Sequence, residues 1–231
     1  MLKTIIKDQF DLLLFRNFKP KTKEFPYQYL LFGLMTAILA GIGRYWDNPR
    51  AHWWQYAGMG SFLYCFVLAF LIYIILSPLK PENWSYYNVL TFVSLTSLPA
   101  LLYAIPVEKF MNLHNAQITN LWFLLTVALW RVILFVLYLK RSARLSGMKI
   151  LVSFLLPIIL IITMLSILNL EHVIIKLMAG LREDEKSVND LAYMIVLFAT
   201  FFSYYLLPVI VPAYLYFIYK KKKSKLPTLG K

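Results

Sequence analysis

Six long apolar stretches make up most of this chain, and they restrict its fold more than any other feature. They cover residues 27–43, 55–76, 87–107, 118–139, 150–170 and 191–219. Most contain about 20 residues, the helical length that crosses roughly 30 Å of hydrocarbon. Backbone groups inside a bilayer must be hydrogen bonded within the protein, so such stretches form helices. The sequence therefore predicts an all-α protein, a polytopic transmembrane helical bundle with about six spans.

The basic residues are distributed unevenly between the two sides of this six-span plan. With the N-terminus in the cytoplasm, 17 of the 24 basic residues are cytoplasmic: Lys3, Lys7, Arg16, Lys19, Lys21, Lys23, Lys80, Lys140, Arg141, Arg144, Lys149, Lys220, Lys221, Lys222, Lys223, Lys225 and Lys231. The opposite loops hold six: Arg44, Arg50, Lys109, Lys176, Arg182 and Lys186. Basic residues are retained on the cytoplasmic side during insertion. Both termini are therefore predicted to be cytoplasmic.

Composition divides the chain into a cytoplasmic amphipathic and basic segment, a transmembrane helical domain and a basic cytoplasmic tail, at residues 1–25, 26–219 and 220–231. In the first part, apolar residues recur at helical spacing: Ile6, Phe10, Leu13 and Leu14. This pattern predicts an N-terminal amphipathic surface helix that lies along the cytoplasmic leaflet. A tail that docks on the protein, or one that frays, is the alternative.

The net charge of +13 would suggest a nucleic-acid partner in a soluble protein. Here the charge lies at cytoplasmic ends of spans, where it attracts anionic lipid headgroups, so we expect no nucleic acid. The single cysteine, Cys65, lies inside the second span and excludes an internal disulfide. We interpret it as a small packing residue.

The first external loop concentrates groups that bind anions. Asn48-Pro49 favours a turn that folds Asp47 back toward Arg50. Arg44 and Arg50 are then candidates to bind a lipid phosphate, with Asp47 beside them, as a lipid or partner contact. The alternative, which we prefer, is an aromatic-anchored hairpin whose polar groups satisfy the ends of the first two spans.

All three histidines lie on the external side of the predicted topology: His52, His114 and His172. Together with external carboxylates they form a speculative site for a divalent metal. Their spacing matches no local metal-binding motif, so we expect no resident cofactor. A membrane-embedded metal-dependent enzyme stays open as an alternative function.

Arg131 is the one basic residue placed well inside a predicted span. Burying it costs several kcal/mol unless it is paired, hydrated or snorkelled. Leu139 ends the span about 12 Å further along the helix, so the side chain is predicted to reach a freed carbonyl or a lipid phosphate. In the third span, Pro99 frees a carbonyl, and the hydroxyls of Ser94, Thr96 and Ser97 just before it are candidates to satisfy that carbonyl. That Ser/Thr cluster is also the candidate path for a small-solute transporter, the second alternative function.

Residues from about 10 to 170 resemble the Yip1 family of small polytopic proteins. The resemblance rests on the lead "DQFDLLLFRNFKPKTKEF", on "SYYNVLTFVSLTSLPALLYAIP" in the third span, and on the pair of spans "NLWFLLTVALWRVILFVLYLKRSARLSGMKILVSFLLPIIL". The family typically has five spans with its ends on opposite sides, whereas this sequence predicts six. The resemblance implies a role in membrane organisation, trafficking or as an adaptor, and it carries no catalytic residues.

The function that these features favour is a non-catalytic integral membrane protein of the Yip1-like type. We expect it in a bacterial inner membrane, acting through contacts with membrane lipids, with a membrane-protein partner or with a second copy of the chain. The candidate contact residues are Arg44, Asp47, Arg50 and Arg131.

Overall fold

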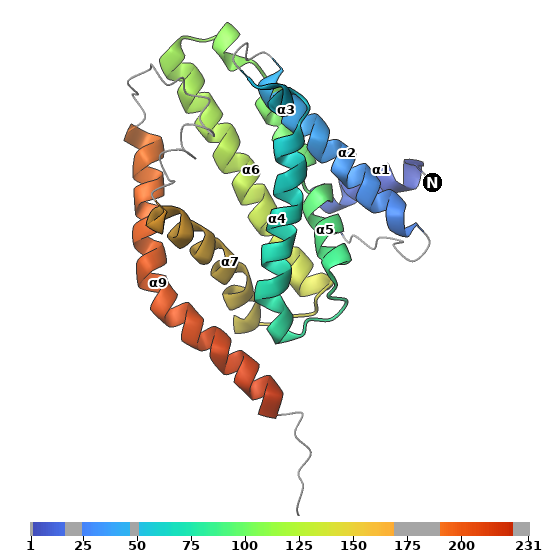
Figure 1. Cartoon of the computed structure of the whole chain (residues 1–231), viewed down its shortest axis with the longest axis vertical. Coiled ribbons are helices and arrows are strands. Elements are labelled where there is room, and N and C mark those ends of the chain that lie inside the picture. The colour runs from blue at the N-terminus through green and yellow to red at the C-terminus, as the bar shows by residue number, and fades with distance from the viewer. Residues whose placement is uncertain (1, 17–24, 47–50, 169–189, 224–231) are drawn as a thin grey trace, which may run out of the picture. The chain divides into compact units, whose positions relative to one another are not determined.

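The structure, a computed structural model, describes residues 2–16, 25–46, 51–168 and 190–223 (Figure 1). Every regular element in these ranges is a helix. Five stretches are long and apolar enough to cross a membrane: Met59–Leu79, Tyr86–Lys109, His114–Arg141, Met148–Ile167 and Ile195–Lys223. The prediction of an all-helical chain with membrane-spanning helices is confirmed at this level.

Five of the six predicted spans overlap these stretches, and the first does not. Residues 27–43 belong instead to α2 (Pro26–Tyr45), a helix of 20 residues. Gln28 and Arg44 lie near its two ends and limit its apolar run to the residues between them.

The chain divides into two compact units. Unit 1 comprises residues 1–73 and 83–137, and unit 2 comprises residues 74–82 and 138–231. Unit 1 contains α1 (Leu2–Leu13), α2, α3 (Trp53–Tyr56), most of α4 (Met59–Leu76), α5 (Tyr86–Leu95), η2 (Leu98–Ala104), η3 (Val107–Lys109) and most of α6 (Leu113–Arg141). Unit 2 contains η1 (Ser77–Leu79), α7 (Met148–Ile167) and α9 (Asp190–Lys223), with the ends of α4 and α6.

In unit 1, α2 packs along α5 and η2, and small residues of α2 lie at its close contacts (Figure 1). Gly33, Ala37 and Gly41 recur every four residues. Gly33 lies against Ser94 of α5, whereas Gly41 lies against Gly58 and Ser61 at the start of α4. A Cβ on Gly33 would lie 2.4 Å from Ser94 Oγ, closer than any packed atom allows. Small residues at this spacing let helix backbones approach closely inside membranes.

The pairing order along these helices gives their relative directions. Gly33 lies against Ser94 and Gly43 against Ala104, so α2 runs parallel to the third predicted span. Along α6 the order reverses, since Phe92 lies beside Phe135 and Thr96 beside Arg131. The third and fourth predicted spans are therefore antiparallel.

Helix α1 docks on unit 1 through one side. Its buried residues are Ile5, Gln9, Leu12 and Leu13. Of the apolar residues that the sequence analysis placed on one face, Leu13 is buried, whereas Ile6, Phe10 and Leu14 are exposed. The helix therefore has two apolar sides, one against the protein and one facing outward.

Unit 2 has an apolar core between α7 and α9. Val152, Leu156, Ile159 and Ile210 are buried together, surrounded by partly buried apolar side chains of the same helices. Proline is accommodated inside both helices, at Pro157 in α7 and at Pro208 and Pro212 in α9. The sequence also predicts a short amphipathic helix at Glu171–Leu181 and a solvated charge run at Arg182–Lys186, and both lie outside the described residues.

Candidate functional site

The third predicted span is broken in its middle. Helix α5 ends at Leu95 and η2 begins at Leu98, one residue before Pro99. A break leaves carbonyls without their helical donors, and buried carbonyls need partners. Local groups satisfy the first of them, because the hydroxyls of Thr96 and Ser97 donate to Val93 O, at 2.9 and 3.4 Å.

The two carbonyls at the break itself are capped from elsewhere in unit 1. Gln9 of α1 donates from Nε2 to Leu95 O at 2.9 Å, and Arg131 of α6 donates from Nε to Thr96 O at 3.1 Å. Gln9 is only 2% exposed and Thr96 only 4%. We call these four residues, Gln9, Leu95, Thr96 and Arg131, the break site.

Arg131 also supplies the charge that this position favours. The C-terminal end of a helix carries about half an elementary negative charge, so a guanidinium at the C-terminal end of α5 is stabilised there. Its guanidinium carbon lies 5.7 Å from the centre of the Tyr64 ring, a cation–π contact. Of the two partners predicted for Arg131, the structure contains the freed carbonyl.

Helix α1 is attached beside the break site by two further bonds. Trp130, which precedes Arg131, donates from Nε1 to Leu13 O at 2.9 Å, at the C-terminal end of α1. Tyr29 of α2 donates its hydroxyl to the carboxylate of Asp8. Three separate segments of unit 1 therefore hold this short helix in place.

The loop after the first predicted span and the end of the third predicted span meet at the other end of unit 1. Trp46 donates from Nε1 to Ala104 O at 2.9 Å, and Lys109 Nζ lies 4.6 Å from the centre of the Trp46 ring. The Arg44 guanidinium lies 5.2 Å from the centre of the Tyr103 ring. Arg44 thus joins an aromatic anchor, which fits the hairpin interpretation. Asp47 and Arg50 lie outside the described residues.

The histidines have local roles or none that the structure defines. The backbone N–H of His52 donates to Gln55 Oε1 at 2.7 Å, and its ring stacks on Trp54, so this residue starts α3. His114 is exposed at the beginning of α6. Within residues 2–16, 25–46, 51–168 and 190–223, no three His, Cys, Asp or Glu side chains gather as metal ligands. His172 lies outside these ranges.

In unit 2, three segments that were predicted to be cytoplasmic come together. Lys221 of α9 donates from Nζ to Leu79 O and Lys80 O, at 2.8 and 2.7 Å. Arg144 forms an ion pair with Glu82 at 3.1 Å. The turn after α4, the turn after α6 and the end of α9 therefore share one end of unit 2.

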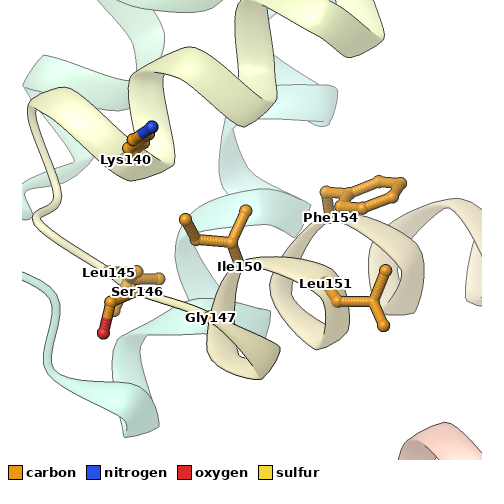
Figure 2. Close-up of a pocket in the computed structure, with 7 residues that line it drawn as sticks. All are labelled: Lys140, Leu145, Ser146, Gly147, Ile150, Leu151 and Phe154. Atoms are coloured by element: carbon orange, nitrogen blue, oxygen red, sulfur yellow. The ribbon is translucent and has the colours of Figure 1, made fainter.

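An open groove lies at this basic end, between the last turn of α6 and the first turns of α7. Figure 2 shows its lining: Lys140, Leu145, Ser146, Gly147, Ile150, Leu151 and Phe154. Its volume is about 410 Å³. The lining is apolar along α7 and polar at the turn.

Gln9 and Gly33 were not among the residues predicted from the sequence. A polar residue between Ile5 and Leu12 on one helix side was a signal that this side meets a polar partner. The four-residue spacing of Gly33, Ala37 and Gly41 was a signal for close helix packing. Both signals identify a contact surface but not its partner.

Comparison with known proteins gives no relative: no family model, no curated protein and no solved structure matches the chain.

Proposed function

We propose that this chain is a six-span, non-catalytic membrane protein of the Yip1-like type, with both ends in the cytoplasm of a bacterium. It acts through contacts with membrane lipids and with a membrane-protein partner or a second copy. In this proposal α1 lies at the cytoplasmic leaflet with Ile6, Phe10 and Leu14 facing lipid.

The parallel packing of α2 and the third span supports six crossings. Two helices separated by one crossing must run in the same direction, and α2 follows the third span from Ser94 to Ala104. The meeting of three predicted cytoplasmic segments in unit 2 supports the orientation. Basic residues concentrated at that end match the positive-inside pattern.

The observation that carries the functional proposal is the break site. Its buried polar groups bind the chain's own carbonyls, through Gln9 and Arg131, so their first role is to hold a broken helix and α1 together. Large apolar side chains are exposed along the predicted spans, among them Leu63, Trp122 and Phe202, as contact with lipid or a membrane partner requires.

One observation favours the transporter alternative. Broken helices with polar groups at mid-span form substrate sites in many transporters. Here a solute would have to displace Gln9 from Leu95 O or Arg131 from Thr96 O. Replacement of one of these hydrogen bonds by a solute would therefore distinguish a transporter from a non-catalytic contact protein.

Cysteine accessibility tests the topology on which the proposal rests. With Cys65 replaced by serine, single cysteines are placed at Lys3, Lys186 and Ser224 in the intact membrane. We expect a membrane-impermeant reagent to reach Lys3→Cys and Ser224→Cys from the cytoplasmic side and Lys186→Cys from the other. Labelling of Lys3→Cys and Ser224→Cys from opposite sides would mean five crossings.

A further inference from the structure

The groove at the basic end of unit 2 combines two chemistries along its length. Ile150, Leu151 and Phe154 of α7 form an apolar wall, and Lys140 lies across from it at the end of α6 (Figure 2). Gly147 turns the chain at φ +53°, and a Cβ there would meet nothing within 4 Å. The groove is therefore open on the side of the turn.

The charges around the groove are not equivalent. Arg144, in the same turn, is neutralised by Glu82 at 3.1 Å. Lys140 is exposed and forms no ion pair within the part of the chain that the structure describes. An unneutralised cation beside an apolar wall is complementary to a molecule with an anionic head and a hydrocarbon chain.

We infer that this groove binds one anionic phospholipid, with its phosphate at Lys140 and an acyl chain along Ile150, Leu151 and Phe154. The inference rests on the proposed function, because it places the α6–α7 turn at the cytoplasmic boundary of the membrane. There the hydrocarbon edge meets the wall of α7 and the headgroup layer meets Lys140. Ser146, exposed at the rim, adds a hydroxyl donor for the same phosphate.

The test uses the full chain, reconstituted into vesicles with equal phosphatidylglycerol and phosphatidylcholine. After extraction in detergent, native mass spectrometry identifies the lipid that the protein retains. We expect wild type to retain one phosphatidylglycerol in preference to phosphatidylcholine. Lys140→Ala should lower that preference about fivefold, the effect of one cation at a membrane surface. Lys149→Ala is the matched control, since Lys149 lies in the first turn of α7 at the same end of unit 2 and carries the same charge but does not line the groove.

Two further variants separate the parts of the site. Lys140→Arg should keep the preference, because it keeps the cation. Leu151→Trp should reduce retention of both lipids by filling the apolar wall, with unfolding in detergent used to verify that each variant is folded. An excess of inorganic phosphate should displace nothing, since it lacks the acyl chain.

Equal losses in Lys140→Ala and Lys149→Ala would mean diffuse attraction by the basic end and would overturn the inference. Wild-type retention by Lys140→Ala or by folded Leu151→Trp would do the same, as would displacement by phosphate alone. None of these outcomes alters the topology test, so failure of the groove is distinguishable from failure of the proposed function.

Discussion

The two units of this protein solve the same problem of helix packing in different ways. Unit 1 joins its helices through glycine contacts and through side chains that cap the break after Leu95, from Gln9 and Arg131. Unit 2 joins α7 and α9 through large apolar side chains, with a hydrogen bond from Tyr204 to Ser166 near the C-terminal end of α7 and the bonds of Lys221 at the other end. The difference teaches that an interrupted helix needs buried, specific partners, whereas continuous helices need only complementary surfaces.

The largest change in stability is expected at Gly33. Gly33→Ala should destabilise the protein by about 3 kcal/mol, because the new Cβ would lie 2.4 Å from Ser94 Oγ and 2.9 Å from Leu95 N. Gly60→Ala is the matched control, since its Cβ would meet only the Trp54 ring at 3.7 Å. Unfolding by SDS titration in detergent measures both. Equal stability of the two variants would show that close packing does not hold α2.

Arg131 tests the capping half of the contrast. Arg131→Leu should cost about 2 kcal/mol, because it leaves the buried Thr96 carbonyl without its donor, while the more apolar span still inserts. Arg131→Lys should recover only part of this stability, since lysine lacks the planar fork. The same unfolding assay, with retained lipid measured by native mass spectrometry, reads both. Wild-type behaviour of both variants would show that Arg131 carries no role.

Gln9 tests whether α1 is held by protein or by lipid. Gln9→Leu should cost about 1 kcal/mol by removing the donor to Leu95 O, and it should raise protease sensitivity of α1 in detergent. Phe10 is 52% exposed on the other side of the same helix, so Phe10→Asp should leave that sensitivity unchanged in detergent and raise it in vesicles. Release by Phe10→Asp in detergent would contradict the docked side described here.

Tyr214 gives the corresponding test in unit 2. Its hydroxyl donates to Ile75 O, and Tyr214→Phe removes only that bond. We expect a loss of at most about 1 kcal/mol, because the apolar core of unit 2 remains. A loss as large as that of Arg131→Leu, in the same assay, would remove the contrast between the units.

The smallest effect is expected at the exposed pair of Glu82 and Arg144. These side chains are 58% and 70% exposed, so water and salt weaken their attraction. Glu82→Gln should change stability by less than about 0.5 kcal/mol. A larger change that persists at high salt would mean that this turn is more deeply involved in the unit than its exposure indicates.

Local features of the fold were predictable because they depend on neighbouring residues. Apolar length alone located five helices that are long and apolar enough to cross a membrane, and Pro99 marked the place where the third of the predicted spans breaks. The prediction that Arg131 reaches a freed carbonyl or a lipid phosphate needed only its isolation inside a span, whereas the choice of Thr96 O depends on the packing of α6 against α5.

Long-range pairings were not predictable in the same way. The sequence shows that α1 has apolar residues on more than one side, but not that the side with Gln9 meets Leu95, 86 residues later. Likewise the basic stretches predicted a common side of the membrane, whereas the bonds from Lys221 to Leu79 and Lys80 depend on the packing of unit 2. The groove beside Lys140 depends on the turn geometry at Gly147.

The attachment of α1 has a consequence for synthesis. The partner of the Leu13 carbonyl is Trp130, which lies 117 residues further along the chain. At about 5–20 residues per second, α1 leaves the ribosome on the order of 10 s before this partner exists. During that interval the helix has both apolar sides uncovered, so the membrane surface or a chaperone must shelter it. Helix α1 can therefore dock only after the fourth predicted span has been made. Among the helices of unit 1, α1 is then one of the last to reach its final position.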